Sequence, residues 1–139
     1  MLIGDIPVRN AGLYPDKIGL IEGDVRLTYA QLNERVNRLG NAIRAMGIRQ
    51  GDRMAVLQHN SYHYPELYFA AAKFGTPIVP LNYRYNVSEV LYVLQDSGAK
   101  VLFYGKEYAS LIEGAQREAT SVDHFICIND TVAGEKSYE

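Results

Sequence analysis

Arg84 is the residue whose type and position could bind a ligand most directly. It follows the apolar run 78–81, which predicts a short β-strand. In parallel sheets, ligands bind beyond the carboxyl ends of the strands. A guanidinium at that place could hold a phosphate through two parallel hydrogen bonds. The alternative is a surface arginine paired with Glu89 or with a carbonyl group, and spacing alone favours this alternative because exposed arginines are common.

Metal binding and nucleophilic catalysis have weaker support. His59 and His63 are four residues apart and would share a helix face if both were helical, but no third ligand is spaced to complete a metal site. Cys127 lies in an apolar run, where a thiol is more often buried and inert. No metal site and no catalytic residue are therefore predicted.

A phosphate-binding loop is the next candidate. Gly98, Gly105 and Lys106 imitate such a loop, but the glycines are too far apart and Glu107 replaces the required hydroxyl residue. Gly98 is better explained as the residue that ends a helix. No cofactor-binding motif is therefore expected here.

Composition limits the class of protein. The chain has 139 residues, 47% of them hydrophobic, which is enough for a packed core. Its 14 basic and 16 acidic residues leave a net charge of −2, and no basic patch indicates a nucleic-acid partner. A single cysteine cannot form an internal disulfide, and the first residues do not resemble a signal peptide. With no apolar run long enough for a transmembrane segment, a cytoplasmic protein is expected.

A long amphipathic helix is predicted between Thr28 and Gly47. The Thr28 hydroxyl can accept a hydrogen bond from the Gln31 amide, and the Gln31 side chain can reach back, as in a capping box. Gly47 can end the helix in a left-handed conformation. The apolar stripe of this helix comprises Leu32, Val36, Leu39, Ile43 and Met46.

Apolar runs alternate with helical patterns along the rest of the chain. Predicted strands cover 18–21, 25–27, 54–57, 78–81, 101–104 and 125–128, and further helices cover 3–14, 62–74, 88–98 and 108–119. Asn60 or Ser61 is expected to cap the second long helix, and Ser88 the third. The alternation predicts an α/β fold: a mostly parallel sheet flanked by helices, with an N-terminal β-hairpin that turns at Gly23.

Five segments in this order share their spacing with one enzyme family. They are Pro15–Ile18, Leu27–Leu32, Gly47–Leu57, Ala72–Asn82 and Asp96–Phe103. Together they resemble the amino-terminal part of the AMP-forming adenylating enzymes, most closely the acyl-CoA synthetases (fatty-acid–CoA ligases). Phe74, Thr76 and Tyr83 depart from the commonest residues of that family, and Tyr83 stands where proline is frequent.

The resemblance implies that residues 1–139 are the amino-terminal part of a large AMP-binding (adenylation) domain, with the C-terminal domain absent. The parent enzyme would join a carboxylic acid, in the first instance a fatty acid, to ATP as acyl-AMP and would transfer the acyl group to coenzyme A. Its cofactors would be ATP, Mg²⁺ and coenzyme A. In family members the residues that carry this chemistry lie further along the polypeptide, so the chain alone is predicted to be inactive.

Arg84 gains a specific role from the same resemblance. In some acyl-CoA ligases an arginine at the matching position helps to hold the nucleotide phosphate of coenzyme A. Arg84 is therefore predicted to bind this phosphate.

Other interpretations stay open. Tyr62, Tyr64 and Tyr68 cluster among eleven tyrosines, and aromatic side chains at such spacing often form cores or interfaces. They favour a non-catalytic structural or dimerisation module, whose partner is a second copy in a homodimer or the rest of a longer chain. Another adenylating-enzyme subfamily, or a free-standing α/β nucleotide binder, would also fit the pattern.

Overall fold

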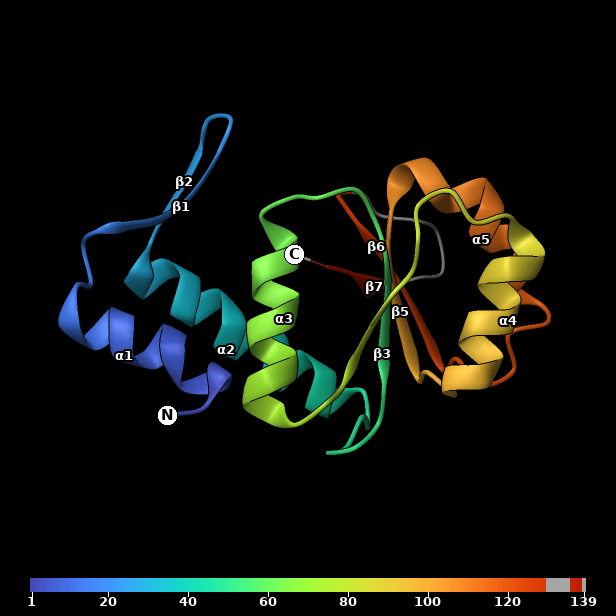
Figure 1. The fold of residues 1–139 in the computed structure, drawn as a ribbon, viewed down its shortest axis with the longest axis horizontal. Helices are drawn as coiled ribbons and strands as arrows, with labels where there is room; N and C mark the ends of the chain where they lie inside the picture. The colour runs from blue at the N-terminus through green and yellow to red at the C-terminus, as the bar shows by residue number, and fades with distance from the viewer. Residues whose placement is uncertain (130–135, 139) are drawn as a thin grey trace. The chain divides into compact units, whose positions relative to one another are not determined.

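The computed structural model describes residues 1–129 and 136–138, which fall into two compact units (Figure 1). The first unit consists of Met1–Gly51 and Asn60–Pro77, and the second of Asp52–His59 and Ile78–Glu139. The chain therefore enters the second unit, returns to the first, and enters the second again. Each unit is described separately below.

The first unit contains a hairpin and three helices, preceded by one turn of 3₁₀ helix. Its elements are η1 (Ile3–Asp5), α1 (Ile6–Leu13), β1 (Ile18–Glu22), β2 (Val25–Thr28), α2 (Tyr29–Ala45) and α3 (His63–Phe74). Strands β1 and β2 pair antiparallel, with Glu22 opposite Val25, and the turn residue Gly23 has a φ of +54°. The predicted hairpin and helices are confirmed.

Helix α2 is built as its sequence predicts. The Thr28 hydroxyl accepts a hydrogen bond from the Gln31 amide at 3.2 Å, and Gln31 Oε1 accepts one from the Thr28 amide at 2.9 Å. The helix ends before Gly47, whose φ is +86°. Four of the five predicted stripe residues are buried, and Met46 is half-buried. The helix packs against α1 and α3.

The second unit is built on a parallel sheet with the strand order β4-β3-β5-β6-β7. In Figure 1 the long strands β3, β5 and β6 run side by side. The strands are β3 (Met54–Leu57), β4 (Ile78–Pro80), β5 (Val101–Gly105), β6 (His124–Ile128) and β7 (Lys136–Ser137). Strands β3 and β5 are buried along their whole length, which explains their uninterrupted apolar sequences.

Two helices, α4 (Val87–Ser97) and α5 (Ala109–Gln116), pack on one face of this sheet. They bury Val90, Leu94 and Ile112 against Leu102 and Tyr104 of β5. One 3₁₀ turn, η2 (Lys106–Tyr108), leads from β5 into α5. The arrangement confirms the predicted α/β class, in which helices cover a mostly parallel sheet.

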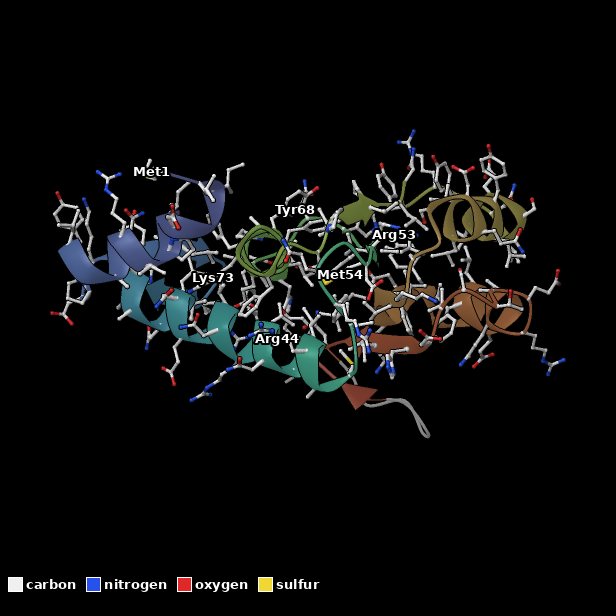
Figure 2. The ribbon with its side chains drawn as sticks, turned by 90° about the horizontal axis from the view of Figure 1, so that it is seen from below. Met1, Arg44, Arg53, Met54, Tyr68 and Lys73 are labelled. Atoms are coloured by element: carbon white, nitrogen blue, oxygen red, sulfur yellow. The ribbon has the colours of Figure 1, made fainter. Side chains whose placement is uncertain are left out.

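The carboxyl end of α4 is closed by two different residues. Gly98 adopts a φ of +59°, and its amide donates to the Gln95 carbonyl, as predicted for a helix cap. Arg53, which is labelled in Figure 2, donates from Nε to the Ser97 carbonyl at 2.6 Å. The positive charge of Arg53 interacts favourably with the negative end of the helix dipole at this carboxyl end.

Three details differ from the sequence-based predictions. Helix α4 is capped by Asn86 rather than Ser88. Asn86 Oδ1 accepts a hydrogen bond from the Glu89 amide, and Glu89 Oε2 accepts one from the Asn86 amide. The second difference is that Tyr62, and not Asn60 or Ser61, occupies the N-cap position of α3. The Ser61 hydroxyl nevertheless accepts a hydrogen bond from the His63 amide at 3.3 Å.

The third difference concerns the length of the last elements. Helix α5 ends at Gln116 rather than at Ala119, and the short strand β7 was not predicted. The polar segment predicted beyond Asn129 includes residues 130–135, which lie outside the described residues. Across the described ranges 1–129 and 136–138, every helix is too short or too polar to traverse a bilayer.

Candidate functional site

Side chains that follow three neighbouring strands meet at the carboxyl edge of the sheet in the second unit. His59 follows β3, Tyr83 follows β4, and Tyr108 follows β5. The ring centroids of His59 and Tyr83 lie 4.6 Å apart, and those of His59 and Tyr108 lie 5.8 Å apart. His59 is in the middle because β3 lies between β4 and β5. We call these three rings the edge cluster.

Arg84 extends the edge cluster with a positive charge. Its Cζ atom lies 5.3 Å from the centroid of the Tyr83 ring, a cation–π contact. Within residues 1–129 and 136–138 its exposed guanidinium forms no salt bridge. Glu89, the expected partner in the alternative interpretation, instead accepts the Asn86 amide at 2.8 Å. The side chain is therefore held by a ring face and leaves its charge open to solvent.

The backbone around Arg84 is fixed by its own turn. Asn82 Oδ1 accepts a hydrogen bond from the Arg84 amide at 3.0 Å, and the Asn82 carbonyl accepts one from the Tyr85 amide at 3.0 Å. Leu81, which is buried, continues the pairing with β3 through the Val56 carbonyl. The Arg84 backbone is thus positioned at the sheet edge by local hydrogen bonds.

Tyr108 is the buried member of the edge cluster. It is 8% exposed, and its hydroxyl has no hydrogen-bond partner within the described part of the chain. Burial raises the pKa of Tyr108, and the nearby Glu107 carboxylate and Tyr83 raise it further. The ring therefore stays neutral near physiological pH and supports His59 as an apolar surface.

The exposed cation at this edge has a chemistry that suits anions. A guanidinium that stacks on an aromatic face uses its flat surface for that contact, and its N–H donors point outward in the plane. Those donors suit the paired oxygens of a phosphate group. The described ranges contain no cluster of three or more His, Cys, Asp or Glu side chains able to hold a metal ion. What the structure shows at this edge is an exposed guanidinium beside the Tyr83 ring.

The other sequence candidates lie elsewhere. His63 begins α3 whereas His59 follows β3, so the two histidines do not share a helix. Cys127 is buried in β6. Gly105 ends β5 and Lys106 begins η2, so the glycine-rich stretch forms a helix cap and a strand end.

A second arginine site, in the first unit, was not predicted. Arg35 of α2 forms an ion pair with Glu66 of α3, whose side chain is only 1% exposed. The Arg35 guanidinium also lies 5.7 Å from the centroid of the Tyr62 ring. The pair joins two helices, and residues 31 positions apart in sequence give no local signal of such a contact.

Lys73, labelled in Figure 2, strengthens the same pair of helices. Its ammonium donates to Asn37 Oδ1 at 2.5 Å and to Asn33 Oδ1 at 3.3 Å. Burial lowers the pKa of Lys73. The polar contacts of this interface stabilise the packing of α2 on α3.

The tyrosine cluster divides between internal contacts and solvent. Tyr62 packs on His63, with ring centroids 3.9 Å apart, while Tyr64 and Tyr68 lie 6.0 Å apart. Tyr68 is exposed. The predicted homodimer contact stays a prediction.

The two larger of the three grooves described for the first unit can also be compared with the sequence candidates. One, of about 420 Å³, is mostly apolar and lies beside Pro7, Tyr29 and Phe69. The other, of about 340 Å³, lies beside Arg44, Gln50 and Phe74 near the carboxyl ends of α2 and α3. Neither contains a residue that the sequence singled out for chemistry.

Comparison with known proteins gives the family. Residues 8–138 match the model of the AMP-binding enzyme family. The chain is 44% identical over 110 residues to a feruloyl-CoA synthase from Amycolatopsis, covering 79% of this chain and 22% of that protein. It is also 44% identical over 96 residues to the long-chain-fatty-acid–CoA ligase FadD13 from Mycobacterium tuberculosis, covering 69% of this chain and 19% of that protein.

A solved structure gives the same result. The anthranilate CoA ligase AuaEII in complex with anthranoyl-AMP superposes with a TM-score of 0.90 at 27% identity, over 99% of this chain and 26% of that one. The chain belongs to the AMP-binding enzyme family, and its relatives include acyl-CoA ligases. It spans about a fifth of the length of the curated relatives described above.

Proposed function

We propose that residues 1–139 form the amino-terminal part of the adenylation domain of an acyl-CoA ligase. This ligase activates a carboxylic acid with ATP and Mg²⁺, forms acyl-AMP with release of pyrophosphate, and transfers the acyl group to coenzyme A. The proposal is supported by the family match over 8–138 and by the likeness to a CoA ligase that holds an acyl-adenylate. Coenzyme A, when bound, supplies the thiol that accepts the acyl group.

A fatty acid is the first substrate class to test. The chain is equally identical to a feruloyl-CoA synthase and to a long-chain-fatty-acid–CoA ligase, so aromatic acids are the second class. Acid-dependent exchange of pyrophosphate into ATP by the full-length ligase would distinguish them. Exchange with long-chain fatty acids, and not with aromatic acids, is the expected result. Exchange with aromatic acids alone would contradict the proposal of a fatty-acid substrate. Exchange with neither class of acid would contradict the proposed activation of these acids.

The 139 residues alone are proposed to be inactive. Activation of a carboxylate on ATP needs cations and hydrogen-bond donors placed around the transferring group. Among the described residues, the cation that we assign to ligand binding is Arg84, which is exposed at the sheet edge and is a single charge. The purified chain should therefore show no ATP–pyrophosphate exchange, and turnover above that of a blank preparation would contradict this.

Arg84 is proposed to hold the nucleotide phosphate of coenzyme A. The observation that carries this proposal is its exposed guanidinium, which stacks on Tyr83 and is free of salt bridges within the described ranges. Arg84 lies beyond β4, at the edge of a parallel sheet where ligands bind.

The test is Arg84→Ala in the full-length ligase, with both half-reactions measured. The KM for coenzyme A should rise about tenfold, since a charge-assisted hydrogen bond contributes roughly 1.5–3 kcal/mol. An effect confined to thioester formation supports the proposal. An unchanged KM for coenzyme A would remove it.

A further inference from the structure

The ring of Tyr83 contacts two other side chains, His59 and Arg84. His59 contacts its ring at a centroid distance of 4.6 Å, and the Arg84 guanidinium lies 5.3 Å from the same centroid. Tyr83 is nevertheless 44% exposed, so its ring is not part of the packed core. Such an exposed ring adds little to core packing, so its contacts with His59 and Arg84 are better explained by orientation of a side chain than by burial.

The support behind Tyr83 comes from the middle of the sheet. His59 follows β3, and Tyr108, which is buried, lies 5.8 Å from the His59 ring. The contacts run from Tyr108 through His59 and Tyr83 to Arg84, in the order of the strands β5, β3 and β4. The rigid sheet thus fixes the end of a chain of contacts that reaches the cation.

The chemistry of stacking fits a positioning role. An arginine side chain has four rotatable bonds, and holding it in one place for a ligand opposes its conformational entropy. Contact with a ring face reduces that freedom before the ligand arrives, while the in-plane N–H donors stay available to phosphate oxygens. Leucine at position 83 would fill similar space without the π face that attracts a guanidinium.

From these contacts we propose that Tyr83 is a positioning residue that aims Arg84 at the nucleotide phosphate of coenzyme A, with His59 and Tyr108 holding the Tyr83 ring. This inference rests on the proposed function of Arg84. Tyr83 acts through Arg84 and does not itself touch the reacting atoms.

The test compares Tyr83→Leu with Tyr83→Phe in the full-length ligase. Tyr83→Leu should raise the KM for coenzyme A about three- to fivefold, because an exposed cation–π contact is weak but real. Its kcat at saturating coenzyme A should change much less, and Tyr83→Phe should retain the wild-type KM because the ring is kept. Tyr92→Leu is the matched control, since Tyr92 is 68% exposed on α4 and lies outside the edge cluster.

A second variant tests the support behind the ring. His59→Ala should also raise the KM for coenzyme A, and it should have little further effect in a Tyr83→Leu background.

If Arg84→Ala raises the KM and Tyr83→Leu does not, the positioning role is wrong while the role of Arg84 stands. If Arg84→Ala leaves the KM unchanged, both roles fall. If Tyr83→Leu and Tyr83→Phe raise it equally, the phenol oxygen and not the ring face is responsible, and the inference is overturned.

Discussion

The two arginines Arg35 and Arg84 both lie near a tyrosine ring, yet their surroundings differ. Arg35 is 27% exposed and pairs with the buried Glu66, so its charge is neutralised inside the first unit. Arg84 is exposed, its guanidinium contacts the face of Tyr83, and it forms no salt bridge within residues 1–129 and 136–138. The comparison teaches that an arginine with a buried carboxylate partner contributes to the fold, whereas an exposed arginine without such a partner keeps its charge available, which is why Arg84 and not Arg35 is proposed to bind a ligand.

The largest loss of stability is expected from breaking the ion pair between Arg35 and Glu66. Arg35→Ala removes the positive charge that pairs with the buried Glu66 carboxylate, and breaking such a pair lowers stability by roughly 3 kcal/mol. Urea unfolding of the 139-residue chain measures this loss. Arg38→Ala in the same helix is the control, because its ion pair with Glu34 is exposed and should contribute less than about 1 kcal/mol. Equal losses in the two variants would contradict the distinction between buried and exposed pairs.

The close packing of α2 on α3 gives the next effect. A Cβ added at Gly40 would lie 1.7 Å from a ring carbon of Phe74, so Gly40→Ala must displace that ring. The expected loss of stability is about 1–3 kcal/mol. Gly12→Ala in α1 meets no atom within 4 Å and should be neutral or stabilising, since alanine favours helices. A stable Gly40→Ala variant, measured by the same unfolding experiment, would show that this interface is loose.

Tyr108→Phe has a smaller effect with a defined pH dependence. The pKa of Tyr108 is raised above its ordinary value of 10.0, so above about pH 10 the unfolded chain releases this proton before the folded one. The stability that Tyr108 contributes is complete below that pH and is lost as the pH rises through the folded-state pKa. Phenylalanine cannot titrate, so the variant should lose less stability between pH 9 and 11.

At neutral pH the same variant should be as stable as the wild type or more stable, by up to about 1 kcal/mol, because the buried hydroxyl lacks a partner in the described part of the chain. Tyr92→Phe serves as the control, since an exposed ring should change neither quantity. A Tyr108→Phe variant that loses several kcal/mol at pH 7 would indicate that the hydroxyl is hydrogen-bonded.

Local sequence signals predicted most of the fold and one member of the candidate site. The capping box at Thr28 and Gln31 and the glycine at 98 act through neighbouring residues, so they could be identified from spacing. Asn86 and Glu89 form the same kind of box, and attention to that spacing would have favoured Asn86 over Ser88 as the cap.

The edge cluster and the Arg35–Glu66 pair required the structure. His59 and Tyr108 come together only because β3 and β5 are neighbours in the sheet, and the sequence pattern gave no strand order. Arg35 and Glu66 meet because two helices pack with a particular rotation. Such contacts depend on tertiary arrangement, although each member of the edge cluster follows a predicted strand and could be sought at that position.

The most direct test of the account compares coenzyme A with dephospho-coenzyme A, which lacks the ribose phosphate, as acyl acceptors for the full-length ligase. The wild-type enzyme should prefer coenzyme A by about tenfold in kcat/KM, and Arg84→Ala should reduce that ratio to near one. The free energy of unfolding of the 139-residue chain should change by less than about 0.5 kcal/mol in the same variant, because Arg84 is exposed. A preference for coenzyme A that survives Arg84→Ala would contradict the assignment of Arg84 to the phosphate.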